Sequence, residues 1–442
     1  MAWFSWLVFA FEGAVAFLLA PSDNCGELSV TVIVIGAVTL LLEMMLMERD
    51  DEVRVVLAAG LLFRVALLVW DLEFSDVWLL PGSGADSEMY ARAAVEGYVS
   101  GDYSRGGAYA RLIGFVYSFF GVQRPIAQFV NLLLGMSMIT LVLRTTDYLV
   151  MGTEAKRSAA KLLCFLPNFA IMNVVLLRET PIAFLLTVSV ALCLRWCVNG
   201  NWTWFACSVL TVMFAATMHS GALAVALGEA VFAVLYDRDA ETLTFEPGTV
   251  ARALVVGVIT IALFSYFGDS IRGKLNTTEV GVVVERTETV YGGSGYTVGI
   301  HTDNSTLDFV VNTPLRMLYF VASPMPWRWR GLTDVIAFFF SALFYIVTYW
   351  LALDVLRQSK KPRHYGPIVF LLLLALSSAF MFGWGVENAG TALRHREKFT
   401  AIYVLLYCLC KESRLPRGTK HVVAKDGFLT LTARARLSHE GR

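Results

Sequence analysis

Long apolar runs recur along almost the whole chain and decide what it can fold into. They lie near residues 3–20, 28–47, 55–70, 125–147, 158–177, 181–197, 202–218, 219–236, 250–268, 332–357, 367–385 and 398–411. About 20 apolar residues are enough for a helix to cross the hydrocarbon core of a bilayer. Only 16% of the residues are charged and the mean hydropathy is +0.61, which excludes a soluble domain. We expect an all-α polytopic membrane protein, a bundle of roughly 11–13 transmembrane helices.

The basic residues of the short polar segments predict the orientation in the membrane. Cytoplasmic loops are enriched in Lys and Arg. Such residues occur at Arg144 with Lys156-Arg157, at Lys360-Lys361-Pro362-Arg363-His364 and in the tail 412–442. All three segments share one side if residues 108–121 do not cross. That segment is shorter than the roughly 20 residues a span needs, so we expect an interfacial helix there. Both termini are then cytoplasmic.

This orientation divides the chain into one membrane domain, residues 1–411, and a basic cytoplasmic tail, residues 412–442. The first large outer loop is 71–124, which includes the expected interfacial helix. A second long outer loop, 269–331, is expected to cap a site on that side. The turns near residues 178 and 219 and the segment 388–398 face the same side. A candidate site on the outer face is therefore assembled from segments far apart in the sequence.

Charge balance and motif content narrow the functional class. The chain has 36 basic and 36 acidic residues, which argues against a nucleic-acid partner. It contains no P-loop, dinucleotide fingerprint or metal-ligand spacing. We therefore expect the bilayer as one partner and no nucleotide cofactor, while a divalent metal stays possible.

The segment 388–398 carries three permanent cations and a histidine within five residues, Arg394, His395, Arg396 and Lys398. Such charges are costly beside hydrocarbon. Their predicted place is the outer face, where topology does not require basic residues. They are typical of a site that binds an anion, and phosphate is the obvious candidate. The alternative is an interfacial charge cluster that only sets the topology.

Asp86 is the candidate general base. It precedes a segment of helical character in the first outer loop. A carboxylate held rigidly at a helix start is well placed to accept a proton. The alternative is that Asp86 only caps the helix with its side chain. Glu88 is a second candidate, although two residues along a helix it points elsewhere.

Four further residues are candidates for binding substrate or phosphate. Arg178 and Glu179 lie at a turn between two apolar runs, and His219 lies at another turn. Trp327 lies among arginines, and Trp and Arg together suit a sugar phosphate. Three of them have a simpler reading. An arginine at a span end can extend to the interface, a lone histidine is often a packing residue, and a Trp often belongs to an aromatic belt.

The order of these motifs resembles the GT-C superfamily of membrane glycosyltransferases, especially bacterial members of cell-surface polysaccharide pathways. The motifs are Asp86-Ser87-Glu88-Met89-Tyr90, Phe120-Gly121, Gln128 with Asn131-Leu132-Leu133-Leu134-Gly135, Leu177-Arg178-Glu179-Thr180-Pro181, Pro324-Met325-Pro326-Trp327, and Asn388-Ala389-Gly390-Thr391 with Arg394-His395-Arg396. The segments around Arg178 and His219 are also similar to Wzy/EpsG-type polysaccharide polymerases.

The resemblance implies inverting transfer of a sugar from a polyprenyl phosphate or diphosphate on the extracytoplasmic face of a bacterial inner or plasma membrane. The acceptor would be a glycan or a lipid-linked glycan. Asp86 would be the base. The lipid phosphate would be bound by Arg178, Arg394 and Arg396, with His395 and Lys398 behind them. The family often has a second acidic residue in a later outer loop, and no position here matches it clearly, which leaves metal use open.

Two other functions stay open from the sequence. A Wzy-type polymerase would join lipid-linked repeat units. A lipid-linked glycan transporter or flippase would place its site at mid-membrane on broken helices, whereas the charged motifs of this chain lie at the ends of apolar runs.

Overall fold

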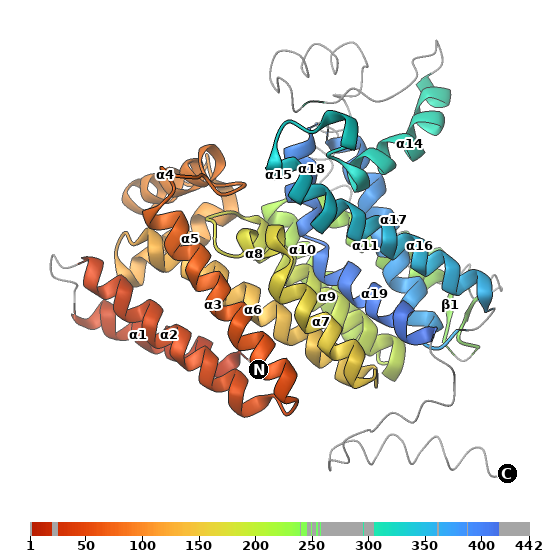
Figure 1. Cartoon of the computed structure of the whole chain (residues 1–442), viewed down its shortest axis with the longest axis horizontal. Coiled ribbons are helices and arrows are strands. Elements are labelled where there is room, and N and C mark those ends of the chain that lie inside the picture. The colour runs from red at the N-terminus through yellow and green to blue at the C-terminus, as the bar shows by residue number, and fades with distance from the viewer. Residues whose placement is uncertain are drawn as a thin grey trace.

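The described part of the chain folds into a bundle of α-helices with a short hairpin (Figure 1). The computed structural model describes residues 2–19, 25–238, 240–244, 249, 253–254, 257, 295, 305–359, 362–386 and 388–414. The first helices are α1 (Trp3–Leu19), α2 (Cys25–Met47), α3 (Asp51–Glu73), α4 (Ala85–Ser100), α5 (Gly107–Phe120), α6 (Arg124–Tyr148), α7 (Thr153–Phe165), α8 (Pro167–Met172) and α9 (Glu179–Asn199). The next elements are α10 (Trp202–Met218), η1 (Ser220–Ala222), α11 (Leu223–Leu235), β1 (Tyr236–Asp237), β2 (Thr242–Leu243) and α14 (Ser305–Ala322). The last are η4 (Pro326–Arg328), α15 (Leu332–Ala337), η5 (Phe338–Ala342), α16 (Leu343–Gln358), α17 (Tyr365–Gly385), α18 (Ala389–Glu397) and α19 (Thr400–Ser413).

The predicted fold class, an all-α polytopic membrane protein, is confirmed. Among the described residues, six helices are long and apolar enough to cross a bilayer, and they match six predicted runs: α2, α3, α6, α9, the stretch α15–η5–α16 and α17. Three shorter apolar helices match three further runs: α1, α10 and η1–α11. The predicted run 250–268 lies largely outside the described residues, so the expected total of roughly 11–13 spans stays a prediction.

Two predicted segments are corrected by the structure. The sequence predicts one span over 158–177, but α7 ends at Phe165 and the short α8 follows. The guanidinium of Arg64 lies at this break and donates to the carbonyls of Leu163 (2.7 Å) and Cys164 (2.9 Å). The sequence also predicts a loop over 269–331, but 305–322 form α14, which packs against α17.

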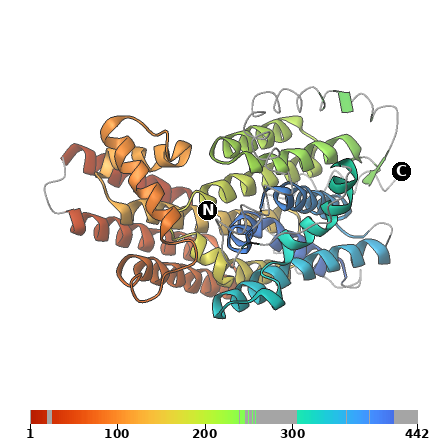
Figure 2. The same cartoon turned by 90° about the horizontal axis from the view of Figure 1, so that it is seen from above.

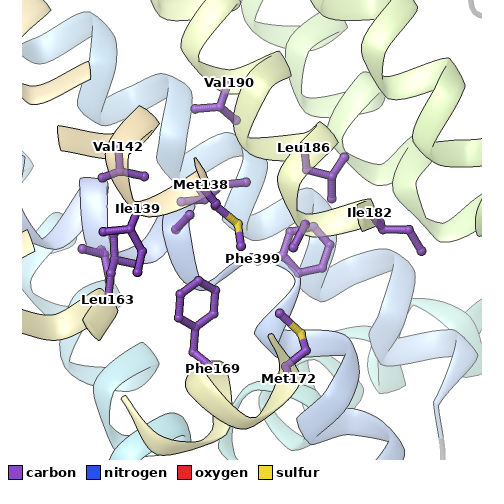
Figure 3. Close-up of a cluster of buried hydrophobic side chains, with 14 of the residues drawn as sticks. Met138, Ile139, Val142, Leu163, Phe169, Met172, Ile182, Leu186, Val190 and Phe399 are labelled. Atoms are coloured by element: carbon purple, nitrogen blue, oxygen red, sulfur yellow. The ribbon is translucent and has the colours of Figure 1, made fainter. Parts of the chain in front are cut away.

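Part of the buried core lies where α6, α7, α8 and α9 meet (Figure 3). In α6, 89% of the most apolar window is buried inside the protein, against 28% for α2, so α6 is the central helix and α2 a peripheral one. Met138 and Ile139 of α6 face Phe169 of α8 and Leu186 of α9 across this core (Figure 3). Seen from above, the first helices lie on one side of the bundle and α14–α19 on the other (Figure 2).

The two ends of α6 mark two different ends of the bundle. At the Tyr148 end, the basic segments meet: Glu412 pairs with Arg363 (3.1 Å) and accepts from the backbone N–H of Gly152 (3.0 Å), and Lys411 approaches Ser158. We call this the basic end. At the Arg124 end lie α4 and α5, with α18 at the same end of the molecule (Figure 1). We call this the site end.

The described residues of the three predicted basic segments therefore share one end, as the topology predicted, while Lys360, Lys361 and residues 415–442 lie outside the described residues. Helix α5, with 14 residues, coincides with the expected interfacial segment and packs against α4 and α1. The cytoplasmic assignment of the basic end stays a prediction.

Candidate functional site

Asp86 and Arg394 meet at the site end although they are 308 residues apart in the sequence. Their carboxylate and guanidinium form a direct ion pair between α4 and α18. The Asp86 side chain is 47% exposed and that of Arg394 is 27% exposed, so both are within reach of a ligand. The capping reading of Asp86 is wrong. The N-cap of α4 is Gly84, with φ +95°, and no side chain caps the helix.

Arg178 comes to the same place from the start of α9, where it is the N-cap residue. Its Nη1 donates to the carbonyl of Met218 (3.2 Å), and its guanidinium lies 5.8 Å from the ring centroid of Tyr90. Its Nε is buried and has no hydrogen-bond partner in the described structure. None of the ion pairs found among the described residues gives Arg178 a carboxylate. Arg178 is thus a cation held by neutral groups.

Tyr90 lies among these charges, and the sequence reasoning assigned it no role. It is buried on α4, and its ring packs edge-on against Tyr109 of α5, with 5.1 Å between centroids. Burial raises the pKa of Tyr90 to about 12, and the charges of Arg178, Glu179, Asp86 and Arg394 act on it as well. The signal was present in the sequence, because Tyr90 is one helical turn after Asp86 and so shares its face.

A second, more deeply buried group adjoins the first. Lys398 and Glu179 form an ion pair (3.6 Å) whose side chains are almost fully buried. The Nζ of Lys398 also lies 2.9 Å from Nδ1 of His395. The His395 ring stands edge-on to that of His219, with 5.0 Å between centroids. Burial is the main reason that the pKa of His395 lies well below its ordinary value, and the charge of Lys398 is the next.

Two polar side chains of α6 hold the irregular backbone that precedes Arg178. Asn131 Nδ2 donates to the carbonyls of Val175 (2.8 Å) and Leu177 (3.2 Å). Gln128 Nε2 donates to Asp71 (2.7 Å) and to the carbonyl of Val174 (3.1 Å). Buried carbonyls without partners are costly inside an apolar bundle. These amides therefore make a non-helical approach to Arg178 possible within the core.

Three predicted site residues lie outside this arrangement. Glu88 pairs with Arg124 (2.5 Å) and so ties α4 to the start of α6. Trp327 is on η4 and its side chain is largely exposed, at 69%. Arg396 is buried, and its Nη1 donates to the carbonyls of Phe320 (2.9 Å), Val321 (2.9 Å) and Ser323 (2.5 Å). The guanidinium thus stabilises the end of α14, and we do not carry Arg396 into the anion-binding set.

The predicted residues that the structure brings together are Asp86, Arg178, Glu179, His219, Arg394, His395 and Lys398. We call them the charged cluster. Across the described ranges, no group of three or more His, Cys, Asp or Glu side chains is arranged to hold a metal ion. Metal use by the protein stays open.

A separate cavity of about 480 Å³ lies at the basic end, lined by residues that include Tyr148, Tyr236, Arg363 and His364. It is at the opposite end of α6 from the charged cluster and does not belong to the candidate site.

A scan against protein-family models and a search of curated proteins found no match to the chain. The fold and the cluster define its class on their own. It is an all-α polytopic membrane protein with a partly exposed carboxylate–arginine pair at one end of the bundle, backed by buried charges.

Proposed function

We propose that the chain is a membrane-embedded glycosyltransferase of bacterial surface-polysaccharide assembly. Its donor is a sugar or oligosaccharide on polyprenyl phosphate or diphosphate, its acceptor is a glycan or lipid-linked glycan, and the reaction takes place on the extracytoplasmic face of the inner or plasma membrane. The observation that carries the proposal is the meeting of an accessible carboxylate, Asp86, with Arg394 and Arg178 at the end of an apolar helix bundle.

The charges of the cluster favour an anionic ligand. Lys398 is balanced by Glu179, and Arg394 by Asp86. Arg178 then remains with a carbonyl and an aromatic face as its contacts. A cation in such surroundings gains most from a ligand that carries negative charge, and a guanidinium is well suited to phosphate oxygens. A lipid phosphate would supply the missing charge.

The Asp86–Arg394 pair suggests how binding and chemistry are connected. A donor phosphate that binds Arg394 competes with Asp86 for the guanidinium and leaves the carboxylate able to act as base. Asp86 then accepts the proton of the acceptor hydroxyl while the oxygen of that hydroxyl bonds to the anomeric carbon. The bond from that carbon to the phosphate oxygen breaks, and the phosphate leaves with the electron pair. A positioned base typically contributes ~10²–10⁴-fold.

The arginines favour the transition state over the bound donor because negative charge grows on the leaving phosphate. The place of the cluster, at one end of α6, agrees less well with a flippase, whose site is expected near mid-membrane. Single-sugar transfer and Wzy-type polymerisation need the same base and the same phosphate ligands, so their products distinguish them.

The test is Asp86→Asn, which keeps size and removes basicity. The purified protein would be reconstituted in liposomes and given a panel of sugars on polyprenyl phosphate and diphosphate, with transfer followed by a labelled sugar. We expect turnover to fall by ~10²-fold or more. Asp102→Asn, which changes an exposed carboxylate bonded to Ser104, is the matched control and should remain active. Normal turnover by Asp86→Asn would refute the assigned base. A ladder of repeat units would indicate a polymerase.

A further inference from the structure

The contact between Lys398 and His395 determines where the imidazole carries its proton. The Nζ of Lys398 lies 2.9 Å from Nδ1 of His395. A lysine ammonium has three donors and no acceptor, so the imidazole nitrogen that it contacts must accept. Nδ1 is then unprotonated, and a neutral ring carries its proton on Nε2.

We propose that the Glu179–Lys398 pair is a positioning device that fixes His395 as the neutral Nε2–H tautomer. His395 then serves the charged cluster as a hydrogen-bond donor and not as a base. The tautomer follows from the contacts alone. The further statement, that the donor is directed to the phosphate of the lipid carrier, rests on the proposed function.

The ion pair keeps the ammonium in its donating form. Lys398 is 1% and Glu179 is 4% exposed in their side chains, so neither charge is compensated by bulk water. A buried lysine without a partner tends to lose its proton, and a nearby carboxylate opposes this. Glu179, the first residue of α9, thereby acts on His395 of α18 through Lys398, the C-cap residue of the same helix.

The other groups around His395 also oppose its protonation. His219 faces it from the end of α10, and Phe382 of α17 contacts the ring, with 4.9 Å between centroids. Arg394 and Arg178 add positive charge, which together with burial and Lys398 lowers the pKa of His395. Glu179 lies beyond Lys398 and neutralises the lysine. Around neutral pH the ring stays uncharged.

The Nδ1 of His219, like that of His395, accepts a hydrogen bond from a protein donor. Its Nδ1 accepts the backbone N–H of Gly221 at 3.0 Å, so its proton, when the ring is neutral, is on Nε2 as well. Two imidazoles side by side thus have their basic nitrogens occupied by protein donors. Neither can readily take the proton of an acceptor hydroxyl, which is consistent with Asp86 as the base.

The experiment is a long-range ¹H–¹⁵N spectrum of the full chain in nanodiscs, with ¹⁵N-labelled histidine. The chain has six histidines, so spectra of His395→Gln and His219→Gln assign the two signals. We expect His395 to show one protonated nitrogen, Nε2, unchanged between pH 7.5 and pH 5.5. In Lys398→Met, the fixed tautomer should be lost and the ring should titrate in this range. Lys411→Met, at the basic end, is the matched control and should leave the His395 signals unchanged.

The wild-type spectrum tests the proposal even if Lys398→Met does not fold. An Nδ1–H signal, a mixture of tautomers or an ordinary titration of His395 in the wild type would overturn it, and so would an unchanged spectrum in a folded Lys398→Met. The spectra are recorded without substrate, so they do not depend on the proposed function. A failure of the proposed function would appear in the transfer assay, as normal turnover by Asp86→Asn. In the transfer assay, the turnover of Lys398→Met should be lower than that of the wild type by about tenfold or more, as expected when one hydrogen bond to a charged group is lost.

Discussion

Replacing Arg396 by Met should destabilise the fold, whereas the same change at Arg394 should leave the fold intact and impair function. The Nη1 of Arg396 holds three backbone carbonyls, those of Phe320, Val321 and Ser323, at 2.5–2.9 Å. Losing a buried partner costs about 1 kcal/mol or more per acceptor, which sums to roughly 3 kcal/mol. At 1.4 kcal/mol per tenfold, the unfolded fraction should rise about a hundredfold.

Arg394 contributes less than Arg396 to the free energy of unfolding. Its pair with Asp86 is partly exposed, and such pairs are worth about 0–1 kcal/mol. Arg394→Met is therefore a matched control from the same helix, with the same change of side chain. We expect it to unfold close to the wild type but to lose donor binding and turnover together, because it removes a ligand of the developing phosphate charge.

The assay is equilibrium unfolding in mixed micelles with an increasing fraction of SDS, followed by the fluorescence of the 11 tryptophans. Arg396→Met should unfold at a clearly lower SDS fraction than either the wild type or Arg394→Met. A wild-type midpoint for Arg396→Met would refute the calculation. If that stable variant had also lost donor binding, Arg396 would return to the phosphate-binding role predicted from the sequence.

Three further predictions follow from the cluster and the topology. Arg178→Lys keeps the charge but not the planar fork, so donor affinity in a binding assay should fall substantially, and unchanged affinity would exclude a bidentate role. Cysteines at the exposed positions Arg105 and Glu154 should be labelled by an impermeant reagent from outside and from the cytoplasm, respectively, and the reverse pattern would invert the orientation. Because the pKa of His395 is lowered in the folded protein, the unfolded chain binds more protons below about pH 6.5, so stability should fall from pH 7 to pH 5. His395→Gln should reduce this slope, and an unchanged slope would contradict the lowered pKa.

Hydrophobicity alone predicts much of the fold. Nine of the expected runs coincide with apolar helices, because a membrane span needs a long uninterrupted apolar segment and little else. The break between α7 and α8 has a signal in its own residues, because Pro167 has no N–H to continue the α7 hydrogen bonds and becomes the first residue of α8. The role of Arg64 at this break could not be predicted, since Arg64 lies 100 residues from Cys164. Helix α14 was missed because Asp308, Asn312 and Arg316 interrupt its apolar pattern.

The grouping of the charged residues follows from topology. Charge-based orientation places Asp86, Arg178, His219 and Arg394 on one face, and the structure brings them together. Sequence could not separate Arg394 from Arg396, since both are cations two positions apart. Their roles differ because residues two apart on a helix point in different directions, one toward α4 and one toward the end of α14. Tyr90 was overlooked because its importance comes from the groups around it.

The buried contact of Arg64 has a consequence for how the protein is made. Its carbonyl partners, Leu163 and Cys164, are translated about 100 residues later. At a translation rate of ~5–20 residues per second, these carbonyls are synthesised roughly 5–20 s after Arg64. A lone arginine at the centre of a membrane helix costs ~2.5–3.5 kcal/mol by insertion scales. Helix α3 therefore enters the bilayer with a guanidinium that bonds the carbonyl of Gly60 in its own helix (3.2 Å), and α7 later supplies two further acceptors. A ribosome that stops after α6 would leave the Arg64 guanidinium in the lipid without the carbonyls of Leu163 and Cys164.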